Sequence, residues 1–219
     1  MKVLGVIGGM GPLATCEFYR RLIEKTPARK DQEHIHVIID SYPQIPDRTA
    51  YLVGAGENPL PYLIDSAQRL EKAGADVLCM PCNAAHAFFD DLSSSVGVPF
   101  LNMVELAVKF VSRFSKSAVV FATDGTLLSG VYQRAAERYG LALRELSRKW
   151  QRKLMDGIYD IKAGRLEEGI EKIEVVNRSI GEETILAACT EVSIALKGKR
   201  NVVDAMDALV EEAIRVCLS

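Results

Sequence analysis

Residues 76–83 read Asp-Val-Leu-Cys-Met-Pro-Cys-Asn, and residues 183–190 read Glu-Thr-Ile-Leu-Ala-Ala-Cys-Thr. Each segment is an apolar, strand-like run that ends at a cysteine and is followed by a polar residue. Asn83 and Thr190 are residue types that favour the N-cap of a helix, so each copy predicts a strand, a cysteine and a helix start. Because open α/β sheets bind ligands at the C-terminal ends of their strands, the repeat predicts that both cysteines lie in one cleft.

Short apolar runs alternate with longer amphipathic segments along the rest of the chain. Strands are predicted at residues 3–7, 36–40, 75–80, 98–101, 118–122, 141–146 and 184–188. Helices are predicted at residues 13–25, 59–73, 130–139 and 156–163. This alternation predicts an α/β fold with parallel sheets, and the apolar character of most strands fits sheets that helices cover on both faces.

A second echo suggests internal duplication. Residues 6–15 match residues 120–129, and Phe18 falls on Tyr132 without a gap. We therefore predict two pseudo-symmetric α/β domains, each a mainly parallel sheet flanked by helices, with the active site in the cleft between them. The first domain would comprise residues 1–100 with a C-terminal helix at 203–219, and the second would comprise residues 101–202.

The composition excludes several classes of protein. The 219 residues are 48% hydrophobic and 26% charged, as in ordinary globular proteins, and the net charge of -2 gives no basic field for nucleic acid. No run approaches the about 20 apolar residues that span a bilayer, and no signal-peptide cleavage site follows the N-terminus. Five cysteines form no disulfide framework, so we expect a soluble cytoplasmic protein with reduced thiols and no membrane partner.

The repeated cysteines, Cys82 and Cys189, are candidates for acid and base chemistry. A position just before a helix favours the thiolate and lowers the pKa of a cysteine. A thiolate and a thiol on opposite sides of a substrate could remove and return a proton next to a carboxylate. Two buried cysteines that only fill space at strand ends are an equally good interpretation of the spacing alone.

Other motifs give weaker signals. The loop Gly8-Gly9-Met10-Gly11-Pro12 follows a strand, but its spacing differs from G-x-G-x-x-G, so a phosphate cradle is not favoured. Cys79 and Cys82 form a single C-x-x-C pair with no second pair, which is weak evidence for zinc. His34 and His36 lack an evident third ligand, so we predict no metal site.

Four motifs occur together in the order of a known family: Gly8-Gly9-Met10-Gly11-Pro12, Pro46-Asp47-Arg48-Thr49, Pro81-Cys82-Asn83-Ala84-Ala85-His86 and Ala188-Cys189-Thr190-Glu191. Over nearly its whole length the chain resembles the aspartate/glutamate racemase family, most closely its aspartate and broad amino-acid racemase branch. The resemblance implies an active site between two α/β domains, with one catalytic cysteine in each. It also implies that no pyridoxal phosphate, no metal and no other cofactor takes part, and that the protein is a homodimer.

The resemblance assigns roles to individual residues. Cys82 and Cys189 match the catalytic pair, and the bound enantiomer decides which of them removes the proton. Arg48 and Lys162 match residues that hold substrate carboxylates. The planar guanidinium of Arg48 suits this task because it can bind both carboxylate oxygens. The remaining residues expected to bind substrate are Met10, Gly11, Asn83, Ala84, Thr126, Thr190 and Glu191.

The leading hypothesis is a racemase that interconverts L- and D-aspartate or a related small acidic amino acid. Ala84 departs from the family pattern, which usually has threonine there, and the missing hydroxyl puts the substrate in question. Two alternatives therefore stay open. One is an isomerase of a related diacid, and the other is a catalytically silent paralogue that binds a carboxylate.

Overall fold

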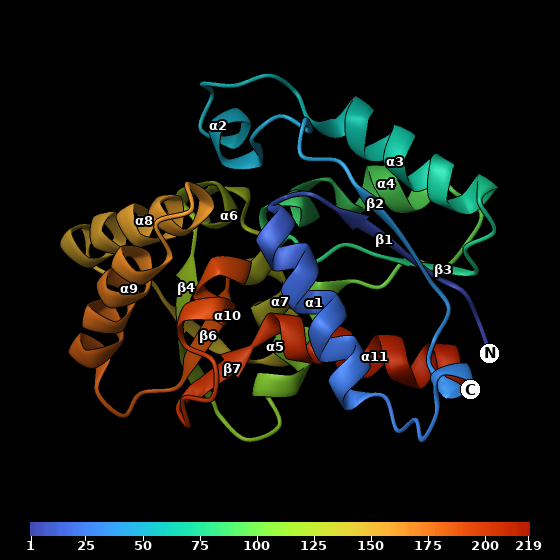
Figure 1. Ribbon diagram of the computed structural model, residues 1–219. Coiled ribbons are helices and arrows are strands. Elements are labelled where there is room, and N and C mark those ends of the chain that lie inside the picture. Colours follow the sequence, from blue (N-terminus) through green and yellow to red (C-terminus); the bar gives the residue numbers. More distant parts are fainter.

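Two parallel sheets, one from each half of the chain, form the centre of the fold (Figure 1). The computed structural model describes residues 1–219. The first sheet has the order β2 (Val37–Ser41), β1 (Leu4–Gly8) and β3 (Val77–Cys79). The second has the order β5 (Ala142–Arg144), β4 (Ser117–Ala122), β6 (Ile185–Ala188) and β7 (Val202–Asp204).

The two sheets repeat one topology. The first strand of each half, β1 or β4, lies between the second and third strands of that half, and all pairs are parallel. Beyond β3 a single parallel bridge joins Leu78 to Phe100, at the place that β7 takes in the second sheet. The predicted pseudo-symmetric α/β fold is therefore confirmed.

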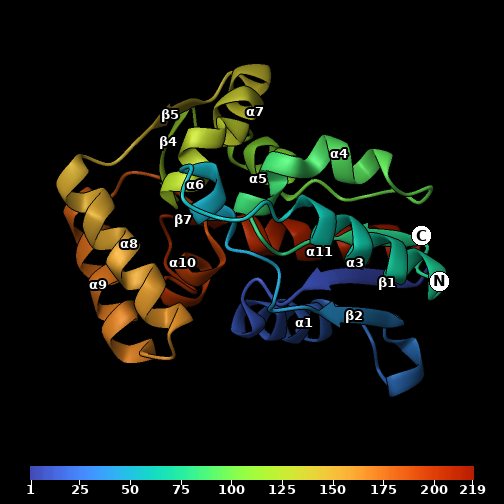
Figure 2. The ribbon, with the colours of Figure 1, turned by 90° about the horizontal axis from the view of Figure 1, so that it is seen from above.

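Helices cover both sheets (Figures 1 and 2). In the first half they are α1 (Pro12–Lys25), α2 (Arg48–Leu52), α3 (Leu60–Lys72), α4 (Phe89–Ser94) and α5 (Met103–Val111), with short 3-10 helices η1 (Asp31–Glu33) and η2 (Ala84–Phe88). In the second half they are α6 (Asp124–Ser129), α7 (Val131–Tyr139), α8 (Arg148–Lys162), α9 (Leu166–Ile180), α10 (Thr190–Ala195) and α11 (Ala205–Leu218). Helices α8 and α9 form an antiparallel pair at one end of the molecule (Figure 2).

The largest core cluster is shared by the two halves. Most of its 29 buried residues come from β1 and β3, from β4 and β6, and from α1, α5, α7 and α11. Full burial of a side chain such as Phe18 stabilises the fold by about 1.5–3 kcal/mol. Helix α11 packs on α1 and also on α5, which lie on opposite sides of the predicted domain boundary at residue 100. The division into domains at residues 100 and 203 therefore stays a prediction.

Several sequence expectations differ from the structure, which also has strand β7 and helix α5 where no such element was predicted. The strand predicted at 98–101 is reduced to the bridge at Phe100, because Pro99 has no N–H to extend a ladder. The helix predicted from Asp156 already begins at Arg148. Helix α9 was not predicted, since Gly169 weakens its helical pattern. That glycine is required because a Cβ there would lie 2.6 Å from the carbonyl oxygen of Gly157 on α8.

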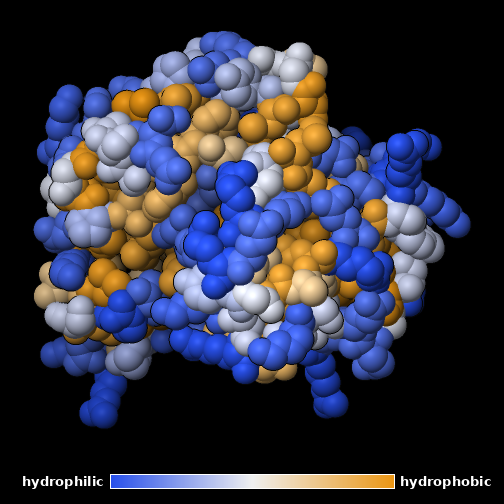
Figure 3. Space-filling model, turned by 180° about the vertical axis from the view of Figure 1, so that it is seen from behind, coloured by the Kyte–Doolittle hydropathy of each residue, from blue (hydrophilic) through white to orange (hydrophobic).

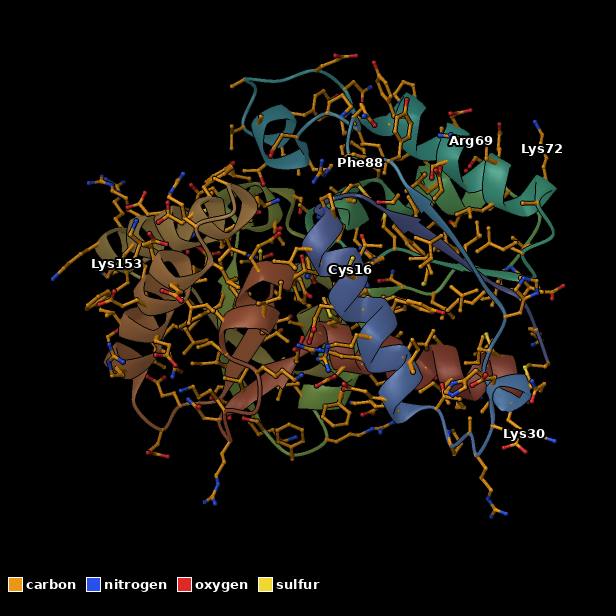
Figure 4. All side chains as sticks on the ribbon, in the orientation of Figure 1. Cys16, Lys30, Arg69, Lys72, Phe88 and Lys153 are labelled. Atoms are coloured by element: carbon orange, nitrogen blue, oxygen red, sulfur yellow. The ribbon has the colours of Figure 1, made fainter.

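Basic side chains occur at separated places on the surface. Lys30, Lys72 and Lys153 lie at widely separated points of the periphery (Figure 4). On the face opposite the Figure 1 view, orange apolar patches alternate with hydrophilic side chains (Figure 3). None of the helices has both the length and the apolar composition needed to cross a membrane.

Candidate active site

The two halves enclose a small cavity at the C-terminal ends of the strands. Its volume is about 20 Å³. The residues that line it are Met10, Asp47, Arg48, Thr49, Cys82, Asn83, Ala84, Thr123, Thr126, Lys162, Ala188, Cys189, Thr190 and Glu191. Every predicted site residue except Gly11 is among them, and Gly11 lines the cleft that adjoins the cavity.

The strand ends deliver the two cysteines to this cavity. Cys189 directly follows β6 and is itself the N-cap of α10, so Thr190 is the first helical residue and not the predicted cap. Cys82 lies beyond the end of β3, and the element that follows it is the 3-10 helix η2. Asn83 takes the N-cap position of η2 but makes no capping hydrogen bond with its side chain.

Cys189 is a protonated thiol in this environment. Burial raises its pKa well above the ordinary value, and the nearby Glu191 carboxylate raises it further, while Lys162 partly offsets both. The Sγ atom donates to Oε2 of Glu191 at 3.1 Å. The expectation that a helix start lowers this pKa is wrong for Cys189, because burial and a like charge outweigh the helix dipole.

Glu191 connects Cys189 to Lys162. Its Oε2 also accepts from the Thr190 hydroxyl at 3.2 Å, and its Oε1 lies 3.7 Å from Nζ of Lys162. Burial opposes the charge on Lys162, but attraction to Glu191 raises the pKa of the lysine overall. The lysine therefore stays charged at the edge of the cavity.

Arg48 is a buried cation without a carboxylate partner. Asp47 caps α2 by accepting from the backbone N–H of Ala50 at 2.8 Å, and this places Arg48 at the start of the helix. The guanidinium donates to the carbonyl oxygens of Ile45, Pro46 and Met10 at 3.0–3.3 Å. Its Nε has no hydrogen-bond partner, so one donor of a buried positive group remains for an anion.

Asn83 offers a second unpartnered donor. The amide oxygen Oδ1 accepts a hydrogen bond from the Tyr132 hydroxyl, whereas the buried Nδ2 has no partner. A buried donor without a partner costs about 1–3 kcal/mol. Together, Nδ2 of Asn83 and Nε of Arg48 suit a carboxylate, which accepts hydrogen bonds with both oxygens.

A chain of hydroxyl groups closes the cavity between the halves. Thr49 on α2 donates to Thr123 at 3.0 Å, and the Thr123 hydroxyl lies 3.0 Å from that of Thr126. Thr123 also caps α6. Sequence reasoning predicted Thr126 but did not assign Asp47, Thr49 or Thr123 to the site. The first two flank Arg48 in its motif, and the N-cap character of Thr123 was the available signal for the third.

An open cleft of about 490 Å³ adjoins the cavity. Met10, Asp47, Arg48, Lys162 and Glu191 line both spaces, so these residues form the wall between them. A volume of about 20 Å³ accommodates roughly one water molecule. The cavity is therefore smaller than an amino acid, whereas the adjoining cleft is larger.

The remaining cysteines lie outside the cavity. Cys79 is buried within β3, and burial raises the pKa of its thiol. Cys16 is exposed on α1 (Figure 4), and Cys217 is buried on α11. No cluster of three or more His, Cys, Asp or Glu side chains is placed to hold a metal ion.

Several known proteins are similar to this chain in sequence or in fold. Residues 7–213 match the family model described as Asp/Glu/hydantoin racemase. The chain is 28% identical over 209 residues to the broad specificity amino-acid racemase RacX of Bacillus subtilis, with 89% of this chain and 87% of that protein covered. The solved structure of Picrophilus torridus aspartate racemase is 29% identical with a TM-score of 0.91, covering 99% and 94% of the two chains. An aspartate racemase homologue from Pyrococcus horikoshii, 24% identical with a TM-score of 0.76, shares the fold over the full length of both chains.

Proposed function

Because the chain belongs to the Asp/Glu/hydantoin racemase family and is therefore an isomerase, we propose that it interconverts the L and D forms of aspartate or a related small acidic amino acid. The reaction would use Cys82 and Cys189 as its two bases and would need no cofactor. One observation carries the proposal: the two thiols come from opposite halves and line the same cavity as the unpartnered donors of Arg48 and Asn83.

The proposed step moves one proton to the enzyme and one back to the substrate. A thiolate takes the α-proton from one face and becomes a thiol, while the opposite thiol gives its proton to the other face and becomes a thiolate. Charge and protons therefore balance within the pair. Cys189 is the protonated partner in the resting site because Glu191 and burial raise its pKa, so it is assigned as the proton donor in that state.

Charge stabilisation must lower a high barrier. Loss of the α-proton places a second negative charge on the substrate carboxylate, and donors aimed at that charge contribute about 3 kcal/mol each. Arg48 is assigned to this carboxylate, since its Nε is free and its guanidinium is buried. Lys162, which only Glu191 pairs at 3.7 Å, is assigned to the side-chain carboxylate of the substrate.

The decisive experiment follows the α-proton in D₂O by NMR with L- and D-aspartate and then with glutamate. We expect the wild type to invert the substrate and to place deuterium at the α-carbon. The variants Cys82→Ala and Cys189→Ala should each lose inversion, because each lacks one of the two bases. Cys16→Ala is the matched control, since this exposed cysteine lies outside the cavity, and it should retain full activity.

Two results would contradict the proposal. Exchange only with a non-amino diacid would favour an isomerase of such acids, a possibility linked to Ala84 in the cavity wall. Binding of aspartate without any exchange would favour a silent carboxylate-binding protein. A cytoplasmic location and a homodimer remain part of the proposal, and the mass in solution tests the latter.

A further inference from the structure

Tyr132 reaches from one half of the molecule into the site of the other. It lies on α7, is fully buried, and donates its hydroxyl hydrogen to Oδ1 of Asn83, the residue that follows Cys82. Asn83 is also buried and lines the cavity. The contact therefore joins the second half directly to the residue beside the first-half cysteine.

This hydrogen bond fixes which end of the amide is available to a ligand. Burial, with the negative charge of Asp204, raises the pKa of Tyr132 well above its ordinary value, so the phenol keeps its proton. Because the phenol satisfies Oδ1, the amide nitrogen Nδ2 is left as a donor without a partner. Rotation of the amide by half a turn would give up the Tyr132 bond.

The residues at the pseudo-symmetric positions do not form the same hydrogen bond. Phe18 on α1 corresponds to Tyr132 in the sequence echo and has no hydroxyl, although it is equally buried. Thr190 corresponds to Asn83, and its hydroxyl is held by its neighbour Glu191 at 3.2 Å. The tyrosine hydroxyl is thus specific to the half that orients an amide.

We propose that Tyr132 is a positioning residue that holds the Asn83 amide with Nδ2 presented to the substrate carboxylate. This inference rests on the proposed racemase function for its substrate. It adds a residue that does not line the cavity, and it makes carboxylate binding in the Cys82 half depend on a helix of the other half.

The test compares Tyr132→Phe with the wild type. The substitution keeps the ring, so we expect the kcat for α-proton exchange to stay within about twofold, because both thiols remain in place. The KM and the dissociation constant of aspartate should rise about five- to tenfold, the effect of losing one oriented hydrogen bond. Thr26→Val is the matched control: it also removes a buried hydroxyl bond, at 2.6 Å to Leu22, but far from the cavity, and should leave both constants unchanged.

A double-mutant cycle separates positioning from a general structural effect. In the Asn83→Ala background, Tyr132→Phe should cause no further rise in either constant, because the amide that it orients is already absent. Additive effects, or an unchanged dissociation constant in Tyr132→Phe, would overturn the positioning role. If the wild type binds aspartate without exchange, the proposed function fails and the binding data alone still decide the role of Tyr132. A wild type that binds no acidic amino acid would overturn both.

Discussion

His86 and Ser193 occupy the same position in the two halves, four residues after Cys82 and Cys189, and each ties its cysteine loop to the start of the next long helix. Nδ1 of His86 donates to the carbonyl oxygen of Cys82 at 2.9 Å, and Nε2 accepts from the N–H of Met103 at 3.0 Å. The backbone N–H of Ser193 donates to the carbonyl oxygen of Cys189 at 3.0 Å.

Ser193 also contacts the start of a helix through its side chain. Its hydroxyl donates to Oδ1 of Asp204 at 2.6 Å, and Asp204 is the N-cap of α11. Met103 is likewise the first residue of α5. Each half therefore fixes its cysteine against the helix that closes that half, although the side chains used are chemically different.

His86 should make stability depend on pH. Burial lowers its pKa to about 4, so the unfolded chain, with an ordinary pKa of about 6.5, binds the proton more readily. The stabilising contribution is complete above pH 6.5 and is lost as the pH falls towards 4. Between pH 7 and pH 5 it should decrease by about 2 kcal/mol.

Urea unfolding of the wild type and of His86→Gln at both pH values measures the contribution of His86 to the free energy of unfolding. At position 86 the variant has no group that titrates in this range, so it should be less stable at pH 7 and show a smaller loss on acidification. Equal losses in the two proteins would show that other groups cause the pH dependence.

Two substitutions should move the pKa of the Cys189 thiol in opposite directions. Glu191→Gln removes a negative neighbour that raises this pKa, and Lys162→Met removes a positive neighbour that lowers it. We expect a decrease in the first variant and an increase in the second. The alkylation rate of Cys189 against pH, followed by peptide mass spectrometry, reports both shifts. Shifts of the same sign would contradict the charge assignment.

Gly125→Ala should disturb the contact between the halves at the site. A Cβ at Gly125 on α6 would lie 2.7 Å from Cα of Thr49 on α2, and backbone cannot yield as a flexible side chain can. Since α2 carries Arg48, kcat/KM should fall about 10- to 100-fold, with a loss of about 1–3 kcal/mol of stability. Gly97→Ala is the control, because its Cβ would meet only the carboxylate of Glu71, at 3.3 Å. Equal activity in the two variants would contradict this account.

Arg21→Met should be far more destabilising than Arg20→Met. The Arg21 side chain is 4% exposed and lies between Glu17 and Asp204, whereas that of Arg20 is 39% exposed. Removing the buried cation leaves the Asp204 carboxylate without its positively charged partner and should lower the free energy of unfolding by about 3–5 kcal/mol. The exposed arginine should contribute at most about 1 kcal/mol. Thermal or urea unfolding compares the two, and similar losses would show that Arg21 is not essential to the junction of α1 with α11.

Much of the fold follows from local sequence patterns. The apolar strands and the amphipathic helices α1, α3 and α7 have periodicities that neighbouring residues impose, so their types could be predicted. Elements that depend on distant partners were not predictable in this way. In the sequence, the glycines of α8 and α9 indicate weak helices, and only the contact between the two helices explains them. Likewise, Pro99 limits strand pairing only because Leu78 lies beside this segment in space.

The sequence by itself determined the α/β class, the repeat, the family and the positions of the two repeated cysteines, because these depend on residue type and order along the chain. Only the tertiary structure decided that Cys189 is protonated and that Arg48 and Asn83 each keep a donor without a partner. The physical reason is that burial, charge and hydrogen-bond satisfaction depend on which groups surround a side chain in space. Glu191 on α10 contacts Cys189, and Tyr132 on α7 contacts Asn83, so packing of separate elements sets these distances.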